Sequence, residues 1–155
     1  MIAHTIVVNE SCVQEISIND KSYTFETIDV TVTPGSLRFD SCVFRNVRLV
    51  LSGNIKFFDC TFNNVQFASS GEVHLQLHRS SMIDIIFDRD FDLAEGDFNQ
   101  TAFYLLSARK NVLANAKFTY ISGDGKIFKN FYFRGYHVCL GPKYMSIGCT
   151  CRTYE

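Results

Sequence analysis

The sequence lacks tryptophan, any long apolar run and any excess of charge of one sign. Its 15 basic and 16 acidic residues give a formal net charge of −1, so no global field favours nucleic acid and no broad acidic surface imitates it. No apolar stretch approaches the roughly 18 residues that span a bilayer. Residues 1–11 contain Glu10 and no basic segment, unlike a signal peptide. We therefore expect a cytoplasmic protein that binds neither membranes nor nucleic acid.

The cysteine and aromatic contents bound the fold further. Six cysteines in a cytoplasmic chain should be reduced thiols. Cys42 and Cys60 occupy equivalent positions in two repeats, so we expect both to be small buried hydrophobic residues. A length of 155 residues fits one domain, and no long helical pattern occurs. Phenylalanine is abundant, with 15 residues, which indicates a regular structure that stacks the rings.

A degenerate repeat runs through the chain. Residues 42–49 (CVFRNVRL) match residues 60–67 (CTFNNVQF), and the similarity continues from 52–55 into 70–73. The shared pattern is a large apolar residue, any residue, Asn or a similar residue, a small or β-branched residue, any residue, and a second large apolar residue. Copies begin at residues 44, 62, 82, 98, 113 and 128, a period of 15 to 20 residues. Such self-similarity is typical of a solenoid.

The spacing within the motif predicts a corner. Two large apolar residues five positions apart fit neither one helix face nor one straight strand, where they would lie on opposite faces. A bend between two short strands lets both point inward, and the polar residue at the bend tolerates left-handed backbone angles. We therefore predict that equivalent residues stack in columns. The expected corner column contains Asn46, Asn64, Asp84, Gln100, Asn115 and Asn130.

These observations predict an all-β fold: a right-handed parallel β-helix of six to seven short coils with irregular terminal caps. The expected division is an N-terminal cap at 1–24, repeats at 25–133 and a C-terminal cap at 134–155, since solenoids need atypical ends. An antiparallel sandwich of short strands is the alternative. The repeat favours the β-helix, because side-chain identities match along the period as well as the turns.

The motif resembles the pentapeptide-repeat family over residues 37–133. That resemblance implies a right-handed quadrilateral β-helix. The family keeps multiples of five between its motifs, whereas this chain does not, so another type of right-handed β-helix is an equal alternative. Residues 145–149 (MSIGC) resemble the tail of small bacterial and phage β-helix proteins. Family members that bind topoisomerases resemble DNA through an acidic face, and the mixed outward positions of this chain count against that function.

One local run of acidic residues is the leading candidate for a binding site. Its members are Asp88, Asp90, Asp92, Glu95 and Asp97. Alternating carboxylates on an extended segment share a face and could bind calcium or a basic partner. The run does not match an EF-hand loop, because Leu93 stands where that loop needs glycine. The alternative is a solvated loop between coils.

Two other groups of residues could bind metal. His137, Cys139, Cys149 and Cys151 offer four zinc ligands, although their spacing is not the usual Cys-x₂-Cys, and the alternative is a cap with reduced thiols. His74 and His78 should lie on the outer face of an alternating strand, where they could share a metal or a proton, or simply form a polar face. The chain contains no nucleophile triad, phosphate loop or metalloprotease motif.

The sequence thus favours a non-enzymatic solenoid that binds another protein, as a bacterial or phage-encoded inhibitor or adaptor of a host protein. Self-association by end-to-end stacking into a dimer or filament is the second hypothesis. A small glycan-binding or glycan-cleaving module is the third. No cofactor is expected apart from the candidate zinc.

Overall fold

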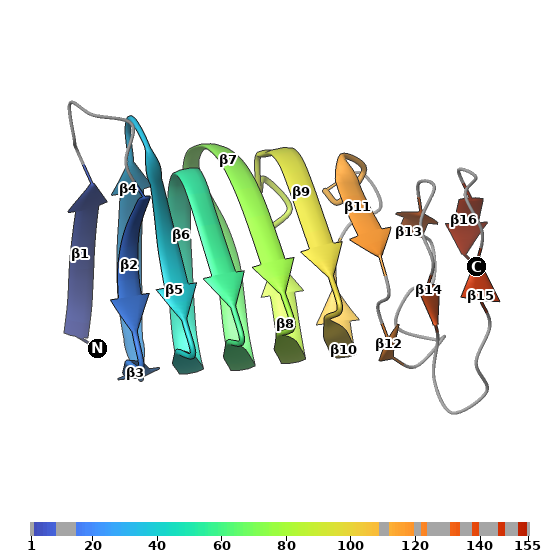
Figure 1. The fold of residues 1–155 in the computed structure, drawn as a ribbon, viewed down its shortest axis with the longest axis horizontal. Helices are drawn as coiled ribbons and strands as arrows, with labels where there is room; N and C mark the ends of the chain where they lie inside the picture. The colour runs from blue at the N-terminus through green and yellow to red at the C-terminus, as the bar shows by residue number, and fades with distance from the viewer. Residues whose placement is uncertain are drawn as a thin grey trace.

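The computed structural model describes residues 2–8, 15–108, 112–119, 122–123, 131–133, 138–139, 146–147 and 152–154. The regular elements of these residues are all strands (Figure 1). They are β1 (Ile2–Val8), β2 (Glu15–Asn19), β3 (Ser22–Thr24), β4 (Glu26–Val32), β5 (Ser36–Asp40), β6 (Val43–Phe58), β7 (Thr61–His78), β8 (Ser81–Phe87), β9 (Leu93–Asn99), β10 (Ala102–Ser107), β11 (Ala116–Thr119), β12 (Ser122–Gly123), β13 (Phe131–Phe133), β14 (Val138–Cys139), β15 (Ser146–Ile147) and β16 (Arg152–Tyr154).

The strands stack in parallel as a β-solenoid of about five turns, which confirms the predicted β-helix with slightly fewer coils than expected (Figure 1). Equivalent residues in successive coils are 18 to 24 positions apart: Ile2 pairs with Glu26, Ser22 with Val43, Val43 with Thr61, Thr61 with Ser81, and Ser81 with Ala102. The stack includes β1, β2 and β3, which pair in parallel with β4, β5 and β6. Toward the C-terminus, β13 pairs with β16 and β14 with β15, both antiparallel.

Each coil has three sides separated by three corners. The first side is a three-residue strand, as in 43–45; the second side follows it, as in 47–51; and the third side closes the coil, as in 54–58. The first corner, between the first and second sides, is a single residue with positive φ: Phe25, Asn46, Asn64, Asp84 or Leu105. The second corner, between the third side and the next coil, is likewise one left-handed residue: Asp20, Ser41, Asp59, Arg79 or Gln100.

The third corner, between the second and third sides, varies in length. It is tight at Gly53, where φ is 97° and an added Cβ would lie 2.0 Å from the backbone oxygen of Val32. It opens to residues 88–92 in the coil of β8 and β9, and in the next coil β10 ends at Ser107 whereas β11 begins only at Ala116. The coil length follows this corner, so the repeat period is not constant.

The structure shows that the later motif copies do not all occupy the same position in the coil as the earlier ones. The copies beginning at 44, 62 and 82 are equivalent, because Phe44, Phe62 and Met82 pair in register. The next member of that stack is Phe103, whereas Phe98 pairs with Leu77 on the third side. The prediction that 98 begins an equivalent copy was therefore wrong. Its cause is physical: both left-handed corners separate two inward residues by five positions, so the same motif occurs twice in each coil.

The predicted corner column is correspondingly divided. Asn46, Asn64 and Asp84 do share the first corner, and Asn64 Nδ2 donates to Asn46 Oδ1 at 2.7 Å. Gln100 instead belongs to the second corner, and Leu105 takes its place in the first. Asn115 lies in the turn before β11, where its Nδ2 donates to the Leu93 carbonyl at 3.2 Å. Asn130 lies outside the described residues.

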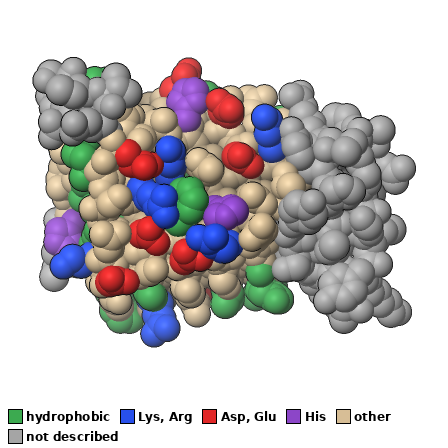
Figure 2. Space-filling model, in the orientation of Figure 1, with side chains coloured by type: hydrophobic (Ala, Val, Ile, Leu, Met, Phe, Trp, Pro, Cys, Tyr) green, Lys and Arg blue, Asp and Glu red, His purple; other side chains and the backbone are tan. Residues whose placement is uncertain are grey.

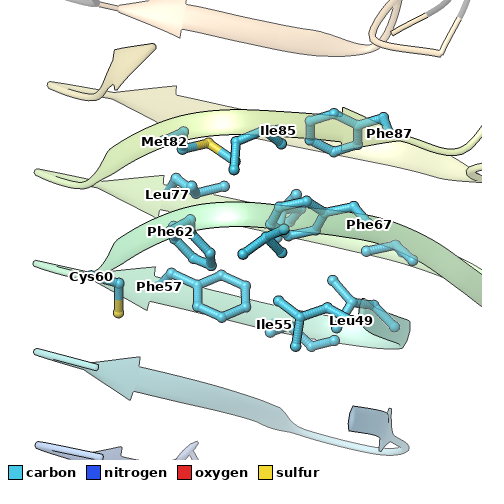
Figure 3. Packing of buried hydrophobic residues seen from close by; sticks show 14 of the residues in the cluster. Leu49, Ile55, Phe57, Cys60, Phe62, Phe67, Leu77, Met82, Ile85 and Phe87 are labelled. Carbon is cyan, nitrogen blue, oxygen red and sulfur yellow. The ribbon is translucent and has the colours of Figure 1, made fainter. Parts of the chain in front are cut away.

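The interior is filled by large aliphatic side chains and by aromatic rings, several of them stacked (Figure 3). The rings of Phe44 and Phe62 are 5.0 Å apart and nearly parallel, as are those of Phe39 and Phe57. Phe57 and Phe62 meet edge to face across the second corner at 5.0 Å. Full burial of each ring contributes roughly 1.5–3 kcal/mol, and the paired geometry adds about 0.5–1.5 kcal/mol.

Candidate functional site

The third side presents many charged side chains, which are visible on the face shown in Figure 2. Strand alternation sends every second residue outward, and the parallel register aligns these residues in three rows across the coils. One row contains Asn54, His74 and Glu95; the next contains Arg38, Lys56, Gln76, Asp97 and Lys117; the third contains Asp40, Phe58, His78 and Asn99.

Three ion pairs neutralise the N-terminal half of this side. Arg38 bonds Asp40 at 2.8 Å. Lys56 Nζ lies 3.0 Å from Glu15 Oε1. At the second corner, Arg79 makes two hydrogen bonds to Asp59, at 2.8 and 3.1 Å, and this guanidinium holds the pKa of the Asp59 carboxyl below its usual value. Exposed pairs of this kind contribute little to stability, but they fix the orientation of side chains on the surface.

An aromatic residue lies among these pairs. The Arg38 guanidinium carbon is 3.8 Å from the centre of the Phe58 ring, a cation–π contact. On the other side, the His78 ring centre is 5.3 Å from that of Phe58. Figure 2 shows basic, acidic, histidine and hydrophobic side chains gathered near the middle of this side. Aromatic and arginine side chains are enriched at the energetic centres of protein interfaces.

A shallow groove of about 220 Å³ lies on the adjoining rows. Its lining is mainly polar: Asn54, Lys56, His74, Leu75, Gln76, Glu95 and Asp97. His74 lies between two carboxylates, with Nε2 3.3 Å from Glu72 and Nδ1 3.6 Å from Glu95. Within the described residues Asp97 has no ion pair, and Lys56 is already paired with Glu15. The groove therefore has an excess of acidic groups.

The structure separates the acidic residues that the sequence places together. The chain turns at residues 89–90 instead of remaining extended. Asp88 is directed back to the second side, where it lies 3.3 Å from Arg48 and accepts a hydrogen bond from Gln66.

Asp90 and Asp92 stay in the turn, anchored through Ser69: its hydroxyl donates to the Asp90 carbonyl at 3.4 Å and accepts from the Asp92 amide at 2.9 Å. Glu95 and Asp97 belong to β9 and line the groove. Only the last two of the five acids thus share a site.

Sequence reasoning missed Asn54, Lys56 and Glu72 as neighbours of Glu95 and Asp97. The alternation along 73–78 correctly indicates that His74, Gln76 and His78 face outward. However, the register of β6, β7 and β9 is needed to place Lys56 beside Gln76, and Gln76 beside Asp97, in one row. A 20-residue step followed by a 21-residue step joins Asn54 to Glu95 and Lys56 to Asp97.

Most of the predicted zinc ligands lie outside the part of the chain that the structure describes. His137, Cys149 and Cys151 lie outside the described residues, and of Cys139 only the backbone of β14 is described. In the described ranges, no cluster of three or more His, Cys, Asp or Glu side chains could hold a metal ion. Cys42 and Cys60 are free and buried, as predicted.

A second groove of about 420 Å³ follows the first corner. Amide side chains of Asn46, Asn64 and Gln66 line its floor, and Phe25 and Ile86 border it. Phe25 has a left-handed backbone conformation, and 66% of its surface is exposed. This groove carries one arginine, Arg48, which is engaged by Asp88.

Comparison of the chain with protein-family models, with curated proteins and with solved structures gives no match. Across the described ranges, no helix has the length and hydropathy to cross a membrane.

Proposed function

We propose that this protein is a non-enzymatic interaction solenoid whose third side binds a basic segment of another protein. It would act as an adaptor or inhibitor, and we place it in the cytoplasm. The single observation that carries the proposal is the groove on the third side, whose lining contains Glu95 and Asp97, while the lysine of that lining, Lys56, is paired with Glu15.

Charge explains the choice of partner. A lysine or arginine entering the groove would meet two or three carboxylates whose pairing among the described residues is incomplete. Because Glu72 and Glu95 are largely exposed, each ion pair formed there contributes about 0.2–1 kcal/mol, so several must act together. The Phe58 cluster next to the groove offers the aromatic and arginine contacts that dominate many interfaces.

Rigidity supports the same conclusion. Every strand of the third side from β5 to β9 pairs in parallel with a neighbour, so the backbone that carries these side chains is held on both flanks. A preorganised surface loses less conformational entropy on binding than a loop does. An extended, regular face is also the surface that solenoid proteins typically use for partners.

The test compares two double variants of equal charge change. Glu95→Gln with Asp97→Asn removes the groove carboxylates, whereas Asp90→Asn with Asp92→Asn removes two carboxylates from the neighbouring turn. Fluorescence anisotropy with a labelled ten-residue arginine–serine peptide measures binding at low and at physiological salt. We expect the groove variant to weaken binding at least tenfold, about 1.4 kcal/mol, and the turn variant less than twofold.

The same variants then serve in affinity capture from the native cytoplasm, followed by calorimetry with the purified partner. A partner lost from the groove variant and retained by the turn variant supports the proposal. Equal binding of peptide and partner to both variants would overturn it.

Self-association is the second candidate. In the described part of the chain β1 pairs only with β4, and its Val7 side chain is 62% exposed. An open strand edge can pair with another chain. Light scattering coupled to size exclusion tests this, and a strict monomer at high concentration would eliminate it.

A further inference from the structure

A column of small thiol and hydroxyl residues lies under the second corner. Each member directly follows the left-handed residue and is buried: Cys42, Cys60, Ser80 and Thr101. Each donates to the carbonyl two residues earlier, the two hydroxyls at 3.1 Å and the two thiols at 3.5 and 3.3 Å. Each of these carbonyls also accepts a backbone amide from the preceding coil, so the side chain supplies a second, local hydrogen bond at the corner. The column therefore has a structural role that both Ser and Cys can fill.

Cys42 and Cys60 are successive members of this column. Their neighbours Val43 and Thr61 pair in parallel, and the Thr61 amide donates to the Cys42 carbonyl at 3.0 Å. Each sulfur also reaches a carbonyl in its own preceding coil at 3.5 Å, Cys60 that of Phe39 and Cys42 that of Ile18. Adjacent strands are about 4.8 Å apart, within the Cα separation of roughly 4.4–6.8 Å that a disulfide requires.

The two thiols perturb each other's ionisation. The interaction with the neighbouring Cys60 thiol lowers the pKa of Cys42 to about 7. The same interaction, together with burial, raises the pKa of Cys60. Ionisation of the pair therefore favours the thiolate, the nucleophilic form, at Cys42, while Cys60 holds its proton.

We propose that Cys42 and Cys60 form a redox-active dithiol that closes to a disulfide between adjacent coils when hydrogen peroxide oxidises it. The Cys42 thiolate attacks one peroxide oxygen; the S–O bond forms, the O–O bond breaks, and the departing hydroxide takes a proton and leaves as water. The Cys60 sulfur then attacks the sulfenic sulfur; the S–S bond forms, the S–O bond breaks, and the second water leaves with the Cys60 proton. Two thiols and one peroxide give one disulfide and two waters.

The pair lies just below the surface of the second corner. The exposed corner residues Ser41 and Asp59 precede the two cysteines in the chain, and the cysteine side chains themselves are buried. Ser80 occupies the next position of the column, so a serine at Cys60 keeps the hydrogen bond to the corner carbonyl while it removes the sulfur.

Peptide mapping of the full chain tests the proposal. The protein is treated with peroxide, unfolded, alkylated and cut with trypsin. Cleavage after Arg38 and Arg45 isolates Cys42 in residues 39–45, and cleavage after Lys56 and Arg79 isolates Cys60 in residues 57–79. We expect these two peptides to be joined, with a mass two hydrogens below their sum, and to separate on reduction. The rate of joining should rise with pH through about 7.

Cys60→Ser and Cys42→Ser are the matched variants, and each should lose the joined peptide while unfolding at the same temperature within a few degrees. In Cys60→Ser, the oxidised Cys42 should accumulate as sulfenic acid that a dimedone probe traps. The proposal is overturned if both cysteines remain fully alkylated after peroxide treatment, or if Cys42 joins the other four cysteines as often as it joins Cys60.

Discussion

Replacing Phe62 by alanine tests the claim that stacked rings hold the solenoid together. Phe62 is fully buried, stacks on Phe44 at 5.0 Å and meets the edge of Phe57 at the same distance. Truncation of a buried phenylalanine typically costs about 3–5 kcal/mol, and the lost ring pairs place Phe62→Ala in the upper part of that range. Because Met82 occupies the equivalent position one coil later, Phe62→Met should cost less than about 1.5 kcal/mol.

Urea unfolding followed by circular dichroism measures these free energies. Phe58→Ala is the matched control, since Phe58 lies on the third side and is only half-buried, and it should cost clearly less than Phe62→Ala. The m-values must agree among the variants, because a solenoid can lose its coils separately. A cost below about 1.5 kcal/mol for Phe62→Ala, or one equal to that of Phe58→Ala, would refute the stacking argument.

Three further predictions concern the corners. Gly53→Ala should destabilise the protein by about 2 kcal/mol or more, since the added Cβ would meet the Val32 carbonyl at a positive φ; in thermal unfolding, Gly71→Ala should be milder, because its Cβ would meet only the movable Ser52 hydroxyl. Leu105→Asn should raise stability by about 0.5–1 kcal/mol, because Leu105 is 67% exposed in a left-handed conformation that asparagine adopts more easily; an unchanged or lower urea midpoint would contradict this. Asp59 has a lowered folded-state pKa, so its pair with Arg79 favours folding above the unfolded value near 3.8 and loses that effect as the pH falls through the lower folded value. Carboxyl NMR titration should show the Asp59 pKa returning toward 3.8 in Arg79→Gln, and an unchanged midpoint would show that Arg79 is not the cause.

The repeat was predictable because its chemistry is local. A five-residue spacing between inward apolar residues, with a left-handed polar residue between them, is visible in the chain at Phe44, Asn46 and Leu49 without any partner. Which copies occupy equivalent positions in the coil was not predictable, since Phe98 to Phe103 shows the same spacing around a different corner. Only pairing partners distinguish the two, and the variable third corner hides them by changing the coil length.

The candidate site shows the same division. The acidic residues were recognisable as a group, and the outward direction of His74 followed from alternation. Whether Asp88 would join Glu95 and Asp97 depended on the turn at 89–90, which directs Asp88 to Arg48 on the second side. Lys56 and Glu15 are 41 positions apart in the chain, yet their pairing at 3.0 Å determines how much negative charge the groove retains.

By itself, the sequence determined the class of fold, the buried character of Cys42 and Cys60, and the outward face of 73–78, because each depends on periodicity along one strand or across one corner. Only the tertiary structure decided which of the later coils are in register and which acids share a groove. The physical reason is that stacking joins residues 18 to 24 positions apart, and that distance is set by corners whose length carries no periodic signal.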